Sequence, residues 1–257
     1  MIPLIDMLTD ATNLAQGWLW AAFLVFLRVG AAMALLPAFG EHSVPQRIRL
    51  ALGVCYTLVI LPAVLDRTPP PQGTLPFATE VIAGLVIGIG LRLFVFALQI
   101  AGTLAAQSTS LSQLFGGQGN EPQPTMSHIF VMAGLALAVM AGLHVRIAEL
   151  FIYSYDVMPF GAFPRGADVA NWGVFRISAA FSLAFSMAAP FIAAALIYNI
   201  ALGVINRAMP QLMVIFVGAP ALTLGGLVLL AVASPLLLRL WLNTLNAYID
   251  NPFAGVP

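Results

Sequence analysis

The sequence predicts an all-α, membrane-type protein with about six long apolar helical segments arranged as broken helical hairpins. Of its 257 residues, 61% are hydrophobic and only 8% are charged, whereas a soluble domain carries about a quarter charged residues. The apolar residues also gather into stretches that approach or exceed the 20 or so residues of helix that cross a bilayer. This composition excludes a disordered protein and argues against a water-soluble globular monomer.

The charge and the cysteine content further limit what kind of protein this can be. Ten acidic residues balance ten basic residues, and all ten basic residues are arginine. Since no net positive field favours a polyanion, no nucleic-acid partner is expected. The single cysteine, Cys55, cannot form an internal disulfide bond. No composition shift marks a boundary, so we expect one domain over residues 1–257.

The six expected segments are separated by residues that end helices. The first two stop at turn-forming proline and glycine residues near Gly40 and Pro69, and the fourth stops at Pro159. The second segment is barely long enough to cross a bilayer. The last two are the clearest because only uncharged residues separate Arg176, Arg207 and Arg239. In order, the segments are 14–38, 48–65, 77–106, 127–153, 173–204 and 211–245.

Prolines and glycines inside the segments predict irregular helices and close contacts. Pro190 is expected to interrupt the fifth segment, and the sequence Gly218-Ala219-Pro220 is expected to break the sixth, because proline lacks a backbone donor. Gly84 and Gly88 form a GxxxG pattern that favours close helix packing in the third segment.

Arginines in apolar segments need an explanation. A charge at the centre of a membrane helix costs about 2.5–3.5 kcal/mol on insertion scales. One explanation is a local pair, such as Arg146 with Glu149 three residues later, or snorkelling. The other is that these helices pack against further subunits, and both explanations stay open. The arginines concerned are Arg28, Arg92, Arg146 and Arg207.

The loops also suggest an orientation. If six helices alternate in direction, the loops around residues 39–47 and 205–210 lie on one side, with Arg47, Arg49 and Arg207. The positive-inside rule then assigns this side to the cytoplasm.

No catalytic or cofactor pattern stands out. His144 is expected to be structural, because no intramembrane carboxylate lies beside it on a helix. Metal-ligand spacing, a nucleophile elbow and a phosphate-binding loop are all missing from the sequence. We therefore expect no enzyme, no metal and no cofactor.

The most distinctive segment is residues 107–126, which are rich in Gln, Ser, Gly and Pro. Three large apolar residues, Leu111, Leu114 and Phe115, directly precede the glycine-rich sequence 116–119. One interpretation is a mobile flap whose apolar side chains fill a hole while its glycines let it swing aside. The other is an ordinary flexible connection with incidental apolar residues.

The order and spacing of four stretches resemble the FliR family of type III secretion export-gate subunits, over essentially the whole chain. The most specific stretch carries Asn206-Arg207, then Pro210-Gln211, then Gly218-Ala219-Pro220. The matching stretches are residues 27–52, 84–102, 141–161 and 188–220.

This resemblance implies a gate subunit of a bacterial inner-membrane export apparatus at the flagellar basal body. It implies contacts with FliP-like and FliQ-like subunits, with FlhB-like and FlhA-like export proteins, and with unfolded secreted proteins. It also implies a plug that closes the pore, formed by Leu111, Leu114, Phe115, Gly116, Gly117, Gln118, Gly119 and Asn120.

Further site residues are expected on the same basis. Arg47 and Arg49 would face the cytoplasmic partner. Contacts with other subunits are expected at Arg28, Arg92, Arg207, Pro210, Gln211, Gly218 and Pro220.

The alternative is a stand-alone secondary transporter for a small solute. Helix breaks near Pro190 and Pro220 would then form a binding site at the membrane midplane. Against this, coupling ions usually require intramembrane carboxylates, and Glu80 and Glu149 are the only acids that border an apolar segment.

Overall fold

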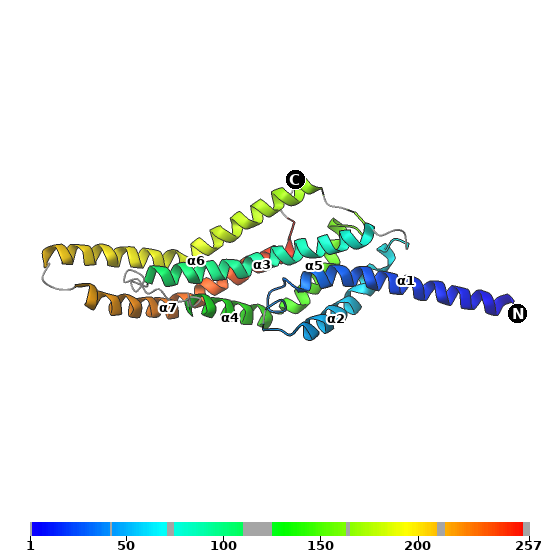
Figure 1. Cartoon of the computed structure of the whole chain (residues 1–257), viewed down its shortest axis with the longest axis horizontal. Coiled ribbons are helices and arrows are strands. Elements are labelled where there is room, and N and C mark those ends of the chain that lie inside the picture. Colours follow the sequence, from blue (N-terminus) through cyan, green and yellow to red (C-terminus); the bar gives the residue numbers. More distant parts are fainter. Residues whose placement is uncertain are drawn as a thin grey trace. The chain divides into compact units, whose positions relative to one another are not determined.

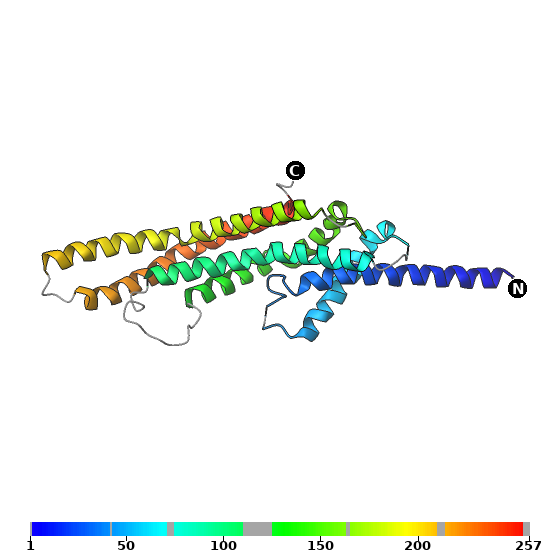
Figure 2. The ribbon, with the colours of Figure 1, turned by 45° about the horizontal axis from the view of Figure 1, so that its top comes forward.

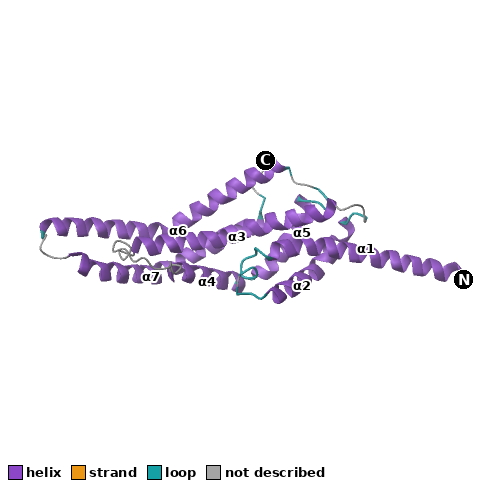
Figure 3. Cartoon of the chain, viewed as in Figure 1, coloured by secondary structure: helices purple, strands orange, loops and turns teal. Residues whose placement is uncertain are grey.

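The computed structural model describes residues 2–41, 43–70, 75–109, 125–162, 165–209 and 214–253. Helices make up nearly all of this part of the chain, and no strand occurs in it (Figure 3). The all-α prediction is confirmed. The elements are α1 (Ile2–Met33), α2 (Gln46–Val64), the short 3-10 helix η1 (Leu65–Arg67), α3 (Leu75–Thr109), α4 (Thr125–Met140), α5 (Leu143–Val157), α6 (Gly166–Ala208) and α7 (Val214–Asp250).

The lengths of these helices match those of membrane-spanning segments. Five helices in the described residues are long and apolar enough to cross a membrane, and a sixth span results if α4 and α5 are taken together. The predicted segment 127–153 is therefore wrong as a single helix, because α4 and α5 meet at an angle of 74°. The bend falls at Gly142, whose φ of 83° is a left-handed conformation that glycine adopts at little cost.

The predicted proline breaks are also wrong. The helix α6 continues through Pro190, and α7 continues through Pro220 and Pro235. Proline removes a single backbone hydrogen bond, which a long helix tolerates when neighbouring groups support the backbone. Near Pro220, the Tyr198 hydroxyl on α6 donates a 2.8 Å hydrogen bond to the Gly218 carbonyl on α7 and so links the two helices.

The chain divides into two compact units. Unit 1 comprises Met1–Arg92, Val139–Val174 and Tyr248–Pro257, and unit 2 comprises Leu93–Ala138 and Phe175–Ala247. The helices α3, α4, α6 and α7 contribute residues to both. The single domain expected over residues 1–257 stays a prediction.

In unit 1, α1 packs closely against α2 and α3. The helices α1 and α2 lie side by side in Figures 1 and 2. On α3, a Cβ atom added at Gly84 would lie 2.1 Å from the Arg28 carbonyl oxygen, and one at Gly88 would lie 3.1 Å from that of Ala32. The GxxxG pattern therefore serves close contact between α3 and α1, as predicted.

In unit 2, α3 packs against both α4 and α7. A Cβ atom at Gly102 would lie 2.2 Å from the Cα atom of Ser127, so α3 and α4 touch through their backbones. Trp241 of α7 is fully buried, and its Nε1 donates a 2.9 Å hydrogen bond to the Phe94 carbonyl on α3. Small residues and fully buried aromatic side chains, which also include Phe130 and Phe191, together build this core.

Replacing Gly84 by alanine should destabilise the fold, because the new methyl group would overlap the backbone of α1. The matched control is Gly173→Ala on α6, where an added Cβ atom meets nothing within 4 Å. That control should be neutral or should stabilise the helix by about 0.5–1 kcal/mol. Thermal unfolding of the two variants in detergent measures the contrast, and equal unfolding temperatures would contradict the close contact.

Candidate functional site

A buried arginine lies at the centre of unit 1. Arg28 on α1 and Glu80 on α3 are 1% and 0% exposed. The Nε of Arg28 lies 2.7 Å from Oε2 of Glu80, and its Nη2 lies 3.1 Å from Oε1. This two-point geometry is the strongest way in which a guanidinium and a carboxylate pair.

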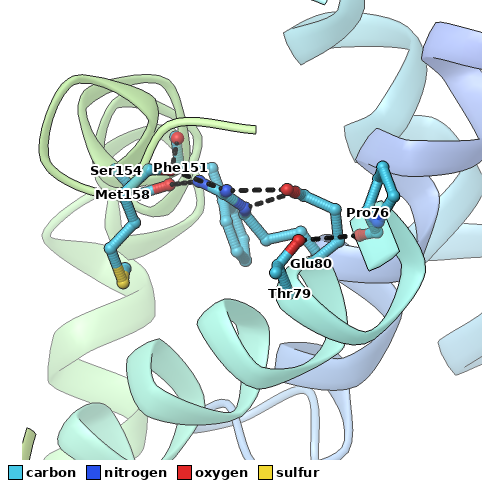
Figure 4. A network of polar contacts seen from close by, with 7 residues as sticks. Pro76, Thr79, Glu80, Phe151, Ser154 and Met158 are labelled. Atoms are coloured by element: carbon cyan, nitrogen blue, oxygen red, sulfur yellow. Dashed lines mark hydrogen bonds and ion pairs between the residues drawn. The ribbon is translucent and has the colours of Figure 1, made fainter. Parts of the chain in front are cut away.

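The remaining donors of Arg28 reach the end of α5 and the turn after it. Its Nη1 donates to the Ser154 hydroxyl at 2.9 Å, and its Nη2 donates to the Met158 carbonyl at 2.8 Å (Figure 4). The guanidinium carbon also lies 3.7 Å from the centre of the Tyr155 ring, in a cation–π contact. That ring stacks in turn on Phe160.

This cluster ties three helices together. Burying two charges is costly, but the cost is offset when the charges pair and their remaining hydrogen-bonding groups are satisfied. Here α1, α3 and α5 supply the partners, and Thr79 and Ser154 bond to backbone carbonyls at the edge of the cluster. Arg28 is therefore a fixed structural charge within the chain.

Other charges pair between elements of unit 1. Arg92 of α3 lies 2.6 Å from Glu41, and Arg67 lies 2.6 Å from Asp156, where both side chains are well exposed. Arg146 pairs with Asp250 at the end of α7. The local pair expected between Arg146 and Glu149 is wrong, because Arg146 pairs instead with Asp250, which lies 104 residues further along the sequence, where a local rule cannot find it.

The structure locates several of the predicted contact residues. Arg47 and Arg207 are exposed, whereas Arg49 is half-buried and donates to the carbonyls of Glu41 and Val44. Gly218 is buried in unit 2, and Pro220 lies within α7. The contacts expected at Arg28 and Arg92 stay predictions, although both charges have partners inside the chain.

The remaining predicted residues lie outside the described part of the structure. These are the eight plug residues, Leu111, Leu114, Phe115, Gly116, Gly117, Gln118, Gly119 and Asn120, together with Pro210 and Gln211.

A second feature is the apolar surface of α6 and α7. Only 17% of the apolar stretch of α6 is buried within the chain, against 56% for α3. Large apolar side chains stay exposed along both helices, and they include Phe175, Phe181, Phe185, Leu196, Ile197, Ile200, Val204, Leu224, Leu227, Val232 and Leu236.

Sequence reasoning missed Glu80 as the partner of Arg28. The signal was present, because an arginine and a glutamate both lie within apolar segments, where buried charges almost always pair with one another. Among the described residues, no group of three His, Cys, Asp or Glu residues is placed to hold a metal ion.

Comparison with known proteins gives these features a context. Residues 19–248 match the family described as bacterial export proteins, family 1. The chain is 33% identical over 240 residues to the flagellar biosynthetic protein FliR of Caulobacter vibrioides, covering 90% of this chain and 95% of that protein. It is 26% identical to FliR of Escherichia coli K12, with 86% of each chain covered. For FliR of Bacillus subtilis 168, the identity is 27%, with 78% and 80% covered.

Removing the carboxylate of Glu80 should cost about 3–5 kcal/mol of unfolding free energy, because Glu80→Ala leaves the Arg28 charge buried and unpaired. The matched control is Asp156→Ala, which breaks an exposed pair and should cost about 0–1 kcal/mol. A double variant, Arg28→Met with Glu80→Met, should recover part of the loss because no charge remains to be buried. Chemical denaturation in detergent measures all three. A loss no larger for Glu80→Ala than for Asp156→Ala would refute the assigned role of the pair.

Proposed function

This chain belongs to family 1 of the bacterial export proteins, and we propose that it is a subunit of the gate through which a flagellar type III system exports proteins. Its relatives named flagellar biosynthetic protein FliR indicate a component of the flagellar export apparatus. Its long apolar helices indicate a membrane location. We assign it to the bacterial inner membrane, at the flagellar basal body.

The observation that carries the gate proposal is the length of the exposed apolar face on α6. Exposed apolar side chains run from Phe175 to Ile205, a length of about 45 Å at 1.5 Å per residue. The hydrocarbon core of a bilayer is about 30 Å thick. Even at a tilt of about 40°, the upper end of the usual range, it covers about 39 Å of helix. Part of this face therefore requires protein neighbours.

We assign those neighbours to FliP-like and FliQ-like helices that pack along α6 and α7. Arg207 fits such a contact because it is exposed in the last turn of α6. The segment that follows, with Pro210, Gln211 and Pro220, would extend the same contact, whereas Gly218 is buried against Leu202 and Tyr198 of α6.

The cytoplasmic partners would meet the loop before α2. Arg47 is exposed there, and its charge fits an acidic surface of an FlhB-like protein. Arg49 lies next to it but points its donors largely into the chain. An FlhA-like protein would engage the same side of the assembled gate, and unfolded secreted proteins would pass through its pore.

The plug assignment rests on the sequence between α3 and α4. Leu111, Leu114 and Phe115 would fill the pore, because an apolar constriction excludes water and therefore ions. The glycines at 116, 117 and 119, with Gln118 and Asn120, would let the segment move aside. The ends of α3 and α4 that flank this segment both belong to unit 2.

An enzyme and a stand-alone transporter fit less well. The relatives carry names that refer to flagellar biosynthesis and to no reaction. The transporter interpretation needed broken helices at Pro190 and Pro220, but α6 and α7 continue through both. It also needed a carboxylate to bind a coupling ion, but the Glu80 carboxylate already forms a buried salt bridge with Arg28.

A charge on the exposed face of α6 should disrupt assembly. Ile197→Glu would bury an unpaired carboxylate in an apolar contact, which is strongly unfavourable. Ile197 is 69% exposed in the single chain, so the variant should still fold. We expect about a ten-fold loss of co-purifying FliP-like and FliQ-like subunits, a loss that corresponds to about 1.4 kcal/mol.

The matched control is Ile197→Ala, which shortens the same side chain without adding a charge and should retain most of the partners. The amount of each variant in the membrane fraction must be equal. If Ile197→Glu co-purified as much of the FliP-like and FliQ-like subunits as the wild-type chain does, the proposed contact would be contradicted.

Deleting residues 111–120 should raise the leakage of small ions through the assembled gate. A second variant, in which Leu111, Leu114 and Phe115 are all replaced by serine, keeps the length of the segment and should leak as well. Conductance of the assembly in planar bilayers measures the effect, with subunit composition checked by gel. Unchanged conductance of an intact assembly in both variants would remove the plug assignment.

A further inference from the structure

An arginine, Arg239, lies on the exposed face of α7. This helix is long and apolar enough to cross a membrane, and its residues 214–238 carry no charge. Two large apolar side chains, Val232 and Leu236, are 73% and 71% exposed on the same face, since residues three or four apart on a helix are neighbours. The other face of α7 is buried at this level, where Trp241 is 0% exposed. The Arg239 charge therefore belongs to a surface that is otherwise largely apolar.

Within the described residues, Arg239 has no anionic partner. No hydrogen bond or ion pair joins it to another described residue. The sequence of unit 2 contains three arginines, Arg176, Arg207 and Arg239, but a single acidic residue, Glu121, which lies outside the described part of the chain. The described part of unit 2 thus carries positive charge and no carboxylate.

Unit 1 shows how this chain treats arginines on its apolar helices. Each of three such arginines lies against a carboxylate that another element supplies. The guanidinium group is planar and presents adjacent donors that match the two oxygens of a carboxylate, which makes this pairing specific. The pairs are Arg28 with Glu80, Arg92 with Glu41, and Arg146 with Asp250.

We propose that Arg239 forms an ion pair with an aspartate or glutamate of a neighbouring export subunit, on a helix that covers this face of α7. Apolar side chains of that helix would pack on Val232 and Leu236 and exclude water from the pair. Asn243, which is exposed one turn after Arg239, would lie at the polar edge of the contact. This pair rests on the proposed function, because its carboxylate comes from another export subunit.

The alternative anion is a lipid phosphate, which an arginine on a membrane helix can reach by extending its side chain towards the headgroups. The exposed surface favours a protein carboxylate. Large apolar side chains are exposed both before Arg239, at Leu236, and after it, at Leu240, which is 43% exposed. A charge that is flanked by apolar contacts on both sides fits a protein contact in which the charge is paired, since intramembrane charges almost always pair with one another.

The test compares substitutions of Arg239 in the full chain, co-expressed with the other export subunits and purified in mild detergent. Arg239→Met keeps an unbranched side chain but leaves the neighbour's carboxylate buried and unpaired, so recovery of that subunit should fall at least about ten-fold. Arg239→Glu should lower it further, because two carboxylates would then face each other. Arg239→Lys keeps the charge and should retain more of the subunit than Arg239→Met does.

The matched control is Arg67→Met, which removes an arginine whose ion pair with Asp156 is exposed in unit 1. This control should leave the recovery of every subunit unchanged. Arg239 is exposed in the single chain, so its variants should fold, and equal amounts of each variant in the membrane fraction check this.

A charge-reversal screen then identifies the carboxylate. Each acidic residue of the other export subunits is replaced by lysine in the presence of Arg239→Glu. One of these substitutions should restore most of the lost recovery, and the same substitution should weaken the assembly of the wild-type chain. Glu121→Lys in this chain is screened alongside them as the internal alternative.

Three outcomes would overturn the proposal. Recovery of all subunits by Arg239→Met at the wild-type level would indicate a lipid phosphate instead. Restoration by Glu121→Lys alone would identify an acid of the same chain. Restoration by no substitution would leave Arg239 without a carboxylate partner. Failure of the proposed function would look different, since the wild-type chain itself would then co-purify with no other export subunit.

Discussion

The buried pair of Arg28 and Glu80 is the interaction on which unit 1 depends. It lies next to Gly84, at which α3 contacts the α1 backbone. A buried pair of charges has few alternative arrangements, because any shift leaves a charge without its partner. Ser154 and Met158 extend this constraint to the α5 end. The pair thus sets how three helices meet, rather than simply adding stability.

Unit 2 follows a different principle. Its inner faces are held by small residues and by buried aromatic side chains such as Trp241, Phe130 and Phe191, but α6 and α7 leave much of their apolar surface exposed. At 43 residues, α6 is about 65 Å long, which is roughly twice the hydrocarbon thickness of a bilayer. One unit of this chain is therefore held by a buried ion pair, whereas the other leaves apolar helix faces exposed. Such incomplete burial is typical of a subunit that reaches its final packing only in an assembly.

The sequence predicted where the helices lie better than it predicted the contacts between them. The length and composition of the apolar stretches located every long helix, because a run of about 20 apolar residues can be recognised from consecutive residues alone. The bend at Gly142 was missed because glycine alone does not reveal a left-handed φ. The breaks at Pro190 and Pro220 were predicted but are wrong, because a proline removes only one backbone hydrogen bond and both helices continue past it. Pairings such as Arg146 with Asp250 join residues far apart in sequence, and a local rule favoured Glu149 instead.

We propose that the exposed face of α6 lies against other protein chains rather than against lipid alone. A photo-crosslinking amino acid at Ile200, which is 59% exposed in the single chain, tests this directly in living cells. After irradiation, this chain should form covalent adducts with a different export subunit. Irradiation that yields only uncrosslinked chain and lipid adducts, in cells that export flagellar proteins normally, would contradict it.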